Sequence, residues 1–181
     1  MLLSLKPHPD SPAGPVSGLE VEVTPRPFNV LELRYRLAGS MAEIAFPPMA
    51  RGRADELWKH TCFELFIREA GQDGYVEFNF ASSMQWAAYR FDGYRAGMRN
   101  ADEFETLELT AGGRPGVFEL RVALDLSGVV GEAADWSLAL AAVVETKAGE
   151  TSLWALEHPA GKPDFHHPEG FALALPAADR S

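Results

Sequence analysis

The chain has 181 residues, 46% of them hydrophobic and 23% charged, which is ordinary for a globular protein that buries a core. Its formal net charge of −10 makes nucleic acid and anionic membrane surfaces poor partners. Cys62 is the only cysteine, which excludes an intrachain disulfide. We therefore expect one domain over residues 1–181 that binds neither nucleic acid nor membrane.

The N-terminal residues predict a cytoplasmic protein. Their apolar run ends at Lys6 and Pro7 and is too short for a signal peptide. No stretch approaches the ~20 apolar residues of a membrane span. The sequence leaves the oligomeric state open.

Short alternating segments dominate the chain. Residues 1–18 read as an edge strand followed by a proline-rich loop, and residues 176–181 as a frayed tail. Between them, alternation predicts strands at Leu19–Val23, Phe28–Leu37, Ala42–Phe46, Thr61–Glu69, Tyr75–Ala81, Met84–Phe91, Thr106–Thr110, Val117–Leu124, Trp136–Thr146, Thr151–Leu156 and Phe171–Leu175. A short helix around Gly131–Ala142 is the alternative there. About ten or eleven regularly spaced strands predict an all-β fold, a β-sandwich.

The stretch Trp58–Phe91 carries polar residues where core packing would put none. Glu64 lies between Cys62 and Phe66, and Glu77 lies inside an aromatic run. A buried carboxylate needs a partner or a cavity, because bare burial costs several kcal/mol or more. If the two strands pair as a hairpin, Glu64 shares a face with Glu77 or Asn79. We interpret this stretch as one wall of a binding site.

Two other interpretations of the carboxylates remain open. Glu64 and Glu77 are suitable as an acid/base pair for glycoside chemistry. A structural pair neutralised by Arg90, Arg95 or Lys59 is the commoner outcome for carboxylates on strands. Phosphate-binding glycine loops and the serine-hydrolase elbow are absent from the sequence, so a non-enzymatic role is favoured without excluding an enzyme.

Two tryptophans and a long loop complete the candidate site. Trp58 and Trp154 lie at strand ends beside polar residues, where an indole makes a platform for a sugar ring. The loop HPAGKPDFHH holds His158, Lys162 and His166, and clusters of this kind can ligate a metal. We predict instead that the loop closes over a ligand, with no metal bound.

The segments LWKHTCFELFI, YVEFNFASSMQWAAYRF and LWALEHPAGKPDFHHPEGF resemble the DOMON-like group related to family 9 carbohydrate-binding modules, over Leu19 to Leu175. The resemblance implies a β-sandwich of jelly-roll type that holds a small ligand on one concave face. By motif position, Trp58 would be one wall of the site and Trp154 a second. Glu64 and Asn79 would contact the hydroxyl groups.

Relatives in the wider superfamily bind haem b through one methionine and one histidine. Here the histidine would be His158, and the methionine Met41, Met49 or Met84. A haem-binding electron-transfer or sensor domain is therefore one alternative function. A small hydrolase or lyase that uses Glu64 or Glu77 with a loop histidine is another.

The leading hypothesis is a non-enzymatic domain without a cofactor that binds a small ligand, a sugar or sugar derivative. The expected ligand contacts are Trp58, Lys59, Glu64, Glu77, Asn79, Trp154, His158, Lys162 and His166.

Overall fold

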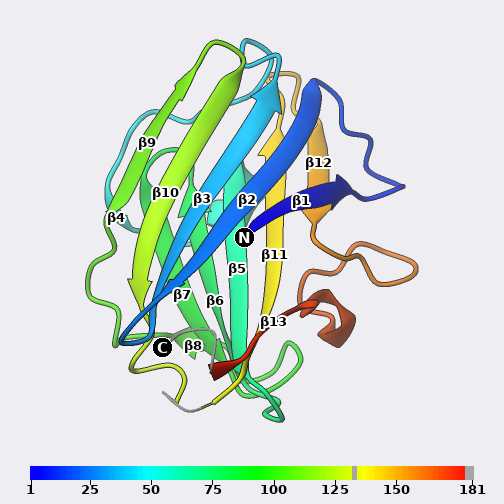
Figure 1. Cartoon of the computed structure of the whole chain (residues 1–181). Coiled ribbons are helices and arrows are strands. Elements are labelled where there is room, and N and C mark those ends of the chain that lie inside the picture. Colours follow the sequence, from blue (N-terminus) through cyan, green and yellow to red (C-terminus); the bar gives the residue numbers. More distant parts are fainter. Residues whose placement is uncertain (132–133, 178–181) are drawn as a thin grey trace.

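The computed structural model describes residues 1–131 and 134–177. Two sheets pack face to face (Figure 1). Sheet A contains, in spatial order, β1 (Leu2–Pro7), β2 (Val16–Arg26), β3 (Val30–Gly39), β10 (Val117–Asp125) and β9 (Leu109–Arg114). Sheet B contains β4 (Gly52–Arg53), β7 (Gln85–Phe91), β6 (Tyr75–Ala81), β5 (Cys62–Glu69), β11 (Trp136–Glu145) and β12 (Thr151–Ala155).

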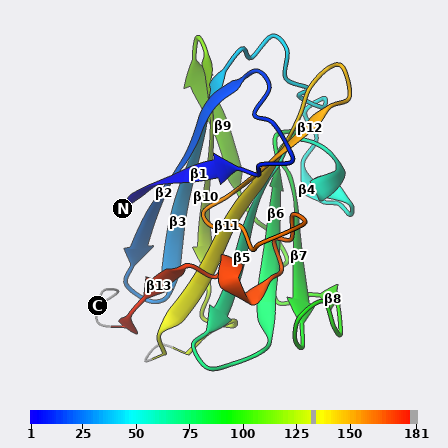
Figure 2. The same ribbon diagram turned by 90° about the vertical axis from the view of Figure 1, so that its right-hand side faces the viewer.

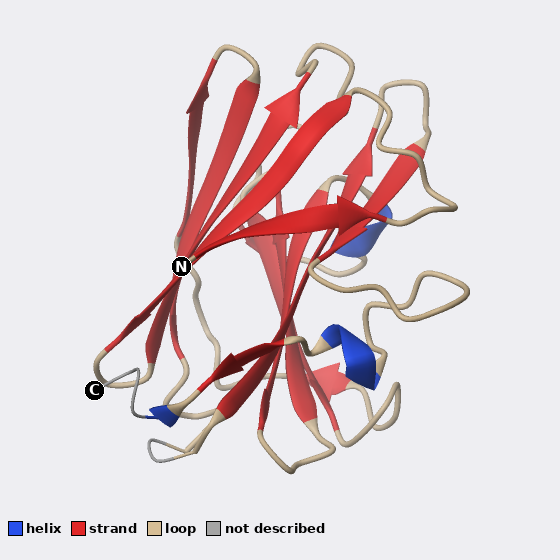
Figure 3. Cartoon of the chain, turned by 45° about the vertical axis from the view of Figure 1, so that its right-hand side comes forward, coloured by secondary structure: helices blue, strands red, loops and turns tan. Residues whose placement is uncertain are grey.

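Shorter elements complete the two sheets. Strand β13 (Leu173–Leu175) pairs with β11, and β8 (Arg99–Asn100) pairs with β7. Strand β1 pairs with both β2 and β12 and so joins the sheets. The 3-10 helices η1 (Leu57–Lys59) and η2 (Pro168–Gly170) lie beyond sheet B, on the side away from sheet A (Figure 3). The predicted all-β sandwich is confirmed.

Strand alternation builds the core between the sheets. Leu31, Leu33, Tyr35 and Leu37 of β3 are all at most 2% exposed, and the residues between them are partly open to solvent. Sheet B differs, because almost every residue of β5 and β6 is buried on both faces. Its outer face is therefore covered by other parts of the chain.

Two predicted strands differ from the structure. Ala42–Phe46 forms only one bridge, between Ile44 and Thr146, so it is no strand. Strand β9 begins at Leu109 instead of Thr106 and continues to Arg114 instead of ending at Thr110. It is an exposed edge strand, so no apolar alternation marks it in the sequence.

The described residues contain thirteen strands, more than the ten or eleven expected, partly because β4 and β8 have two residues each and no periodic pattern. A strand replaces the alternative helix from Trp136 onward, because β11 pairs with β5 and β12 on its two sides. The tail predicted to fray over residues 176–181 lies mostly outside the described residues. No helix in the described part of the chain is long and apolar enough to cross a membrane.

A hydrogen bond across the core connects the two sheets beneath Glu64. The Tyr35 hydroxyl of β3 donates to the Glu64 carbonyl oxygen of β5 at 2.9 Å, and the Tyr35 side chain is fully buried. We expect Tyr35→Phe to lower the free energy of unfolding by about 1–2 kcal/mol, because the carbonyl loses a donor that water cannot replace. Urea unfolding measures this, and an unchanged midpoint would contradict it.

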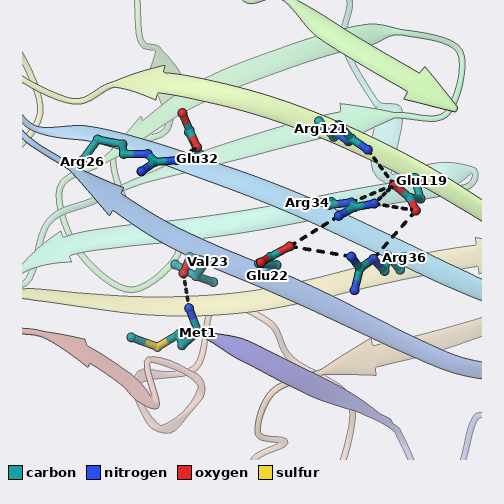
Figure 4. A network of polar contacts seen from close by, with 9 residues as sticks. All are labelled: Met1, Glu22, Val23, Arg26, Glu32, Arg34, Arg36, Glu119 and Arg121. Carbon is teal, nitrogen blue, oxygen red and sulfur yellow. Dashed lines mark hydrogen bonds and ion pairs between the residues drawn. The ribbon is translucent and has the colours of Figure 1, made fainter.

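The outer face of sheet A carries paired charges (Figure 4). The Glu119 carboxylate of β10 lies 2.6 Å from the Arg34 guanidinium and 3.1 Å from that of Arg121. Glu22 of β2 lies 3.7 Å from Arg34 and 3.8 Å from Arg36. Here each carboxylate has arginine partners, which is the ordinary arrangement on a solvated sheet.

Candidate functional site

A cavity of about 420 Å³ lies on the outer face of sheet B. Strands β5, β6, β11 and β12 form its floor, while η1 and the segments 91–98 and 163–166 form its walls. Figure 2 shows the segment after β12 and η2 crossing in front of this sheet. The lining residues are Trp58, Glu64, Glu77, Phe91, Arg95, Met98, Val143, Leu153, Pro163, Asp164, Phe165 and His166.

Small side chains leave room for this cavity. Residues of β11 alternate, so that Leu138 and Leu140 face the core while Ala139 and Ala141 face outward. Ala155 of β12 shares the outward face. Alanine side chains are short, so space remains between the sheet and the loops that cross this face.

Glu64 lies on this floor without a hydrogen-bond partner for one of its oxygens. Its side chain is 3% exposed, and Oε1 is buried and bonded to nothing in the described residues. Its strand neighbours are Ala141 on β11 and Asn79 on β6. Burial, together with the nearby Glu77 carboxylate, holds the pKa of Glu64 well above its usual range.

Glu77 lies on the neighbouring strand with two partners. The Asn79 amide donates to Oε1 at 2.7 Å, and His166 Nε2 lies 3.8 Å from Oε2. Burial raises the pKa of Glu77 to about 7, although the Asn79 hydrogen bond and the Arg95 charge act in the opposite direction. The site thus holds a carboxyl group that titrates near neutral pH.

Ion pairs and hydrogen bonds connect two walls of the cavity. The Arg95 guanidinium pairs with the Asp164 carboxylate at 2.7 Å, and the Tyr94 hydroxyl donates to the same carboxylate. The Tyr75 hydroxyl lies 2.7 Å from His166 Nδ1. Burial, reinforced by the Arg95 charge, lowers the pKa of His166 to about 4, so its imidazole is neutral at pH 7.

The three cations considered as neutralising partners for the carboxylates are engaged elsewhere. Arg90 pairs with Glu103, at 2.5 Å. Lys59 pairs with Glu56, and Arg95 pairs with Asp164. In the described residues, none of the three therefore forms an ion pair with Glu64 or Glu77, although the Arg95 charge still lowers the pKa of Glu77.

Two broader hollows lie on the outer face of sheet A, with volumes of about 980 and 1190 Å³. Their floors are the paired charges of β2, β3 and β10, such as Arg34 and Arg121 with Glu119. These charges satisfy one another at a solvated surface. The smaller cavity on sheet B, which contains a buried oxygen without a partner, is therefore the better candidate site.

No known family model matches the chain, and a comparison with curated proteins found no significant match. Among solved structures, the chain is similar to one described as a "putative carbohydrate-binding protein" from Bacteroides uniformis. The TM-score is 0.69 at 16% sequence identity, and the match covers 93% of this chain and 83% of the other. This likeness shows the fold alone.

Four of the nine expected ligand contacts line the cavity, and a fifth holds one of them by a hydrogen bond. Trp58, Glu64, Glu77 and His166 line it. Asn79 does not line it but donates the hydrogen bond that holds Glu77. The pairing of β5 with β6 places Glu64 directly opposite Asn79, as the hairpin prediction required.

Trp154 does not form the expected second wall. Its indole is 3% exposed and packs in the core between the sheets, where Nε1 donates to the Ser152 hydroxyl at 2.9 Å. Strand alternation is the reason, because Leu153 and Ala155 take the outward positions of β12. The cavity lining contains Phe91 and Phe165 in its place.

The two expected lysine contacts also lie outside the cavity lining. Lys59 follows Trp58 in η1, but its side chain is exposed and its ammonium lies 2.7 Å from the Glu56 carboxylate. Lys162 is exposed on the loop just before the residues that line the cavity. A lysine side chain at the surface keeps its hydration, whereas the cavity is largely apolar.

The residues named for haem lie in separate surroundings in the described part of the chain, and the haem alternative stays a prediction. His158 does not line the cavity, and its Nε2 lies 2.9 Å from the Lys6 carbonyl oxygen. Met49 is 76% exposed, Met84 is buried in the core, and Met41 packs against that core. In the same residues, no group of three or more His, Cys, Asp or Glu side chains is placed to hold a metal ion.

Sequence reasoning missed the pairing of the two loops. Asp164 lies in the loop HPAGKPDFHH, and the sequence suggests Arg95 only as a counter-ion for Glu64 and Glu77. Their ion pair joins positions 69 residues apart, and no local pattern indicates it. Only the packing of both segments over sheet B brings them together.

Proposed function

We propose that this protein binds a small polar ligand, a sugar or sugar derivative, in the cavity on sheet B. The observation that carries the proposal is the buried Glu64 oxygen, which has no hydrogen-bond partner in the described residues and lines a cavity of about 420 Å³. Sites for small molecules have this size and combine apolar walls with a few polar groups. A ligand hydroxyl would satisfy the Glu64 oxygen.

The chemistry of the walls supports a sugar. Trp58 presents its indole at one side of the cavity, and the apolar face of a pyranose ring stacks well on such a surface. Carboxylates bond hydroxyl groups through charge-assisted hydrogen bonds, which are stronger than neutral ones. The similar structure named as carbohydrate-binding and the resemblance to family 9 modules both agree with this ligand class.

Tryptophan fluorescence offers a direct test with a panel of monosaccharides and disaccharides. Trp58 is the tryptophan that lines the cavity, while Trp86, Trp136 and Trp154 are at most 3% exposed. We expect at least one sugar to shift the emission of Trp58. A flat response to every sugar would contradict the proposal.

A second test uses Val143→Phe, because a larger side chain on the cavity floor occupies the space of the ligand. We expect it to weaken sugar binding by at least about tenfold, because the ring takes the ligand's place, with the free energy of unfolding kept or raised. Calorimetry and urea unfolding read the two effects separately. Unweakened binding in this variant would place the ligand elsewhere.

One observation favours a second candidate, a hydrolase or lyase. Glu77 has a pKa of about 7 in a cavity beside Glu64 and His166, which suits a general acid at neutral pH. Nitrophenyl glycosides test it through release of nitrophenol. Turnover that disappears in Glu77→Gln would support an enzyme; release at the buffer rate would reject one for these substrates.

A further inference from the structure

Acidic side chains outnumber cationic ones around the cavity. Glu64, Glu77 and Asp164 supply three carboxyl groups, while Arg95 is the cationic side chain at the site. Its guanidinium is held by Asp164 at 2.7 Å. Two carboxyl groups therefore remain without a cation of their own.

His166 does not supply the missing charge. Its Nδ1 lies 2.7 Å from the Tyr75 hydroxyl, and its Nε2 lies 3.8 Å from the Glu77 carboxylate, too far for a hydrogen bond. Its ring packs edge-on against Phe66 and Phe91. Such an apolar enclosure keeps an imidazole neutral.

Glu64 and Glu77 contrast with the carboxylates of sheet A. Glu119 has three arginines within 4 Å at a solvated surface. Glu64 is 3% exposed, and one of its oxygens bonds nothing in residues 1–131 and 134–177. A buried acid beside a second acid is costly in the empty site, so the ligand is the natural source of the compensating group.

We propose that the ligand of this site carries a protonated amine next to its hydroxyl groups, as an amino sugar does. This inference rests on the proposed function and narrows its ligand class. The ammonium would lie between Glu64 and Glu77, which are on adjacent strands and face the same cavity.

The remaining walls suit such a ligand. Trp58, Phe91 and Phe165 surround the carboxyl groups with aromatic faces, which attract a cation as well as a sugar ring. The Arg95–Asp164 pair closes the rim without adding net charge. A metal ion is a poor alternative, because the described residues offer no group of three ligands.

Matched sugar pairs provide the test. Glucosamine, galactosamine and mannosamine each differ from the parent hexose by an ammonium in place of one hydroxyl. At pH 7 we expect the amine of at least one pair to bind at least about tenfold more tightly than its parent, since hydrogen bonds to charged groups are roughly twice as strong as neutral ones. Calorimetry on the full chain measures both members.

Two variants locate the amine. Glu64→Gln and Glu77→Gln keep the side-chain volume but remove the charge. Each should weaken the binding of the amino sugar by at least about tenfold and the binding of the parent hexose by much less. Glu150→Gln, an exposed glutamate in the turn between β11 and β12, is the matched control and should change neither. Unfolding curves of each variant verify the fold.

The outcomes separate the two proposals. A parent hexose that binds as tightly as its amine, or an equal loss for both in the Glu64 and Glu77 variants, would overturn the amine and leave the sugar site standing. If none of the six sugars binds, both the proposal of an amine-bearing ligand and the proposal of a hexose site are overturned. Selective binding of an amine that both variants abolish would support it.

Discussion

The free energy of unfolding should fall as the pH rises from about 5 to 8, and this fall should be about 3 kcal/mol smaller in Glu77→Gln. The pKa of Glu77 is raised from 4.5 to about 7 in the folded protein. A raised carboxyl pKa stabilises the fold below pH 4.5, and this stabilisation is lost as the pH rises towards 7. Glutamine does not titrate and removes the loss.

The groups that face Glu77 set the shape of the curve. Glu64 acts in the same direction, because burial and the Glu77 carboxylate also raise its pKa. His166 acts in the opposite direction, since its pKa is lowered from 6.5 to about 4 and the fold loses stability as it protonates. These terms partly cancel between about pH 4.5 and 6.5, so the steepest fall should lie near pH 6.5–7.

The other titratable groups close to Glu77 do not change the pH range in which the free energy of unfolding falls. Burial raises the pKa of Tyr75 to about 12 and holds the pKa of Tyr89 above its usual range, and Arg95 stays charged throughout. Urea unfolding at a series of pH values measures the curve. Glu150→Gln, which changes an exposed carboxylate, should reproduce the wild-type curve. The same curve for Glu77→Gln would show that Glu77 titrates normally.

Trp154→Ala should lower the free energy of unfolding by about 3–5 kcal/mol, the usual cost of emptying a buried tryptophan site. Its indole is 3% exposed in the core. We expect sugar affinity to change by less than about threefold in the folded fraction, because the indole does not line the cavity. Trp154→Phe, a smaller loss, allows the binding measurement if the alanine variant does not fold.

Trp58→Ala should show the reverse pattern. Trp58 is partly exposed at the cavity wall, edge-on to Tyr89 with ring centroids 6.0 Å apart. Its loss should weaken sugar binding by at least about tenfold and change unfolding much less than Trp154→Ala does. Calorimetry reads the binding, since this variant removes the reporting indole. Equal effects of the two substitutions would contradict the assignment of Trp58 to the site.

Local patterns predicted most of this fold. Alternating apolar residues located the long strands, such as Phe28–Leu37, because a half-buried strand repeats every two residues. They also singled out Glu64 and Glu77, because a carboxylate buried inside an aromatic strand is costly without a partner or a cavity. The exposed edge strand β9 was misplaced because neither of its faces is apolar.

Only the tertiary structure decided which residues meet. The sequence by itself indicated an all-β chain, with Glu64 and Glu77 on one predicted hairpin and a candidate ligand-binding loop far from it in the chain. It did not determine which face of β12 looks outward, so it could not tell the core Trp154 from the cavity-lining Leu153. Nor did it join Arg95 to Asp164, because contacts between distant loops depend on the packing of both over the same sheet.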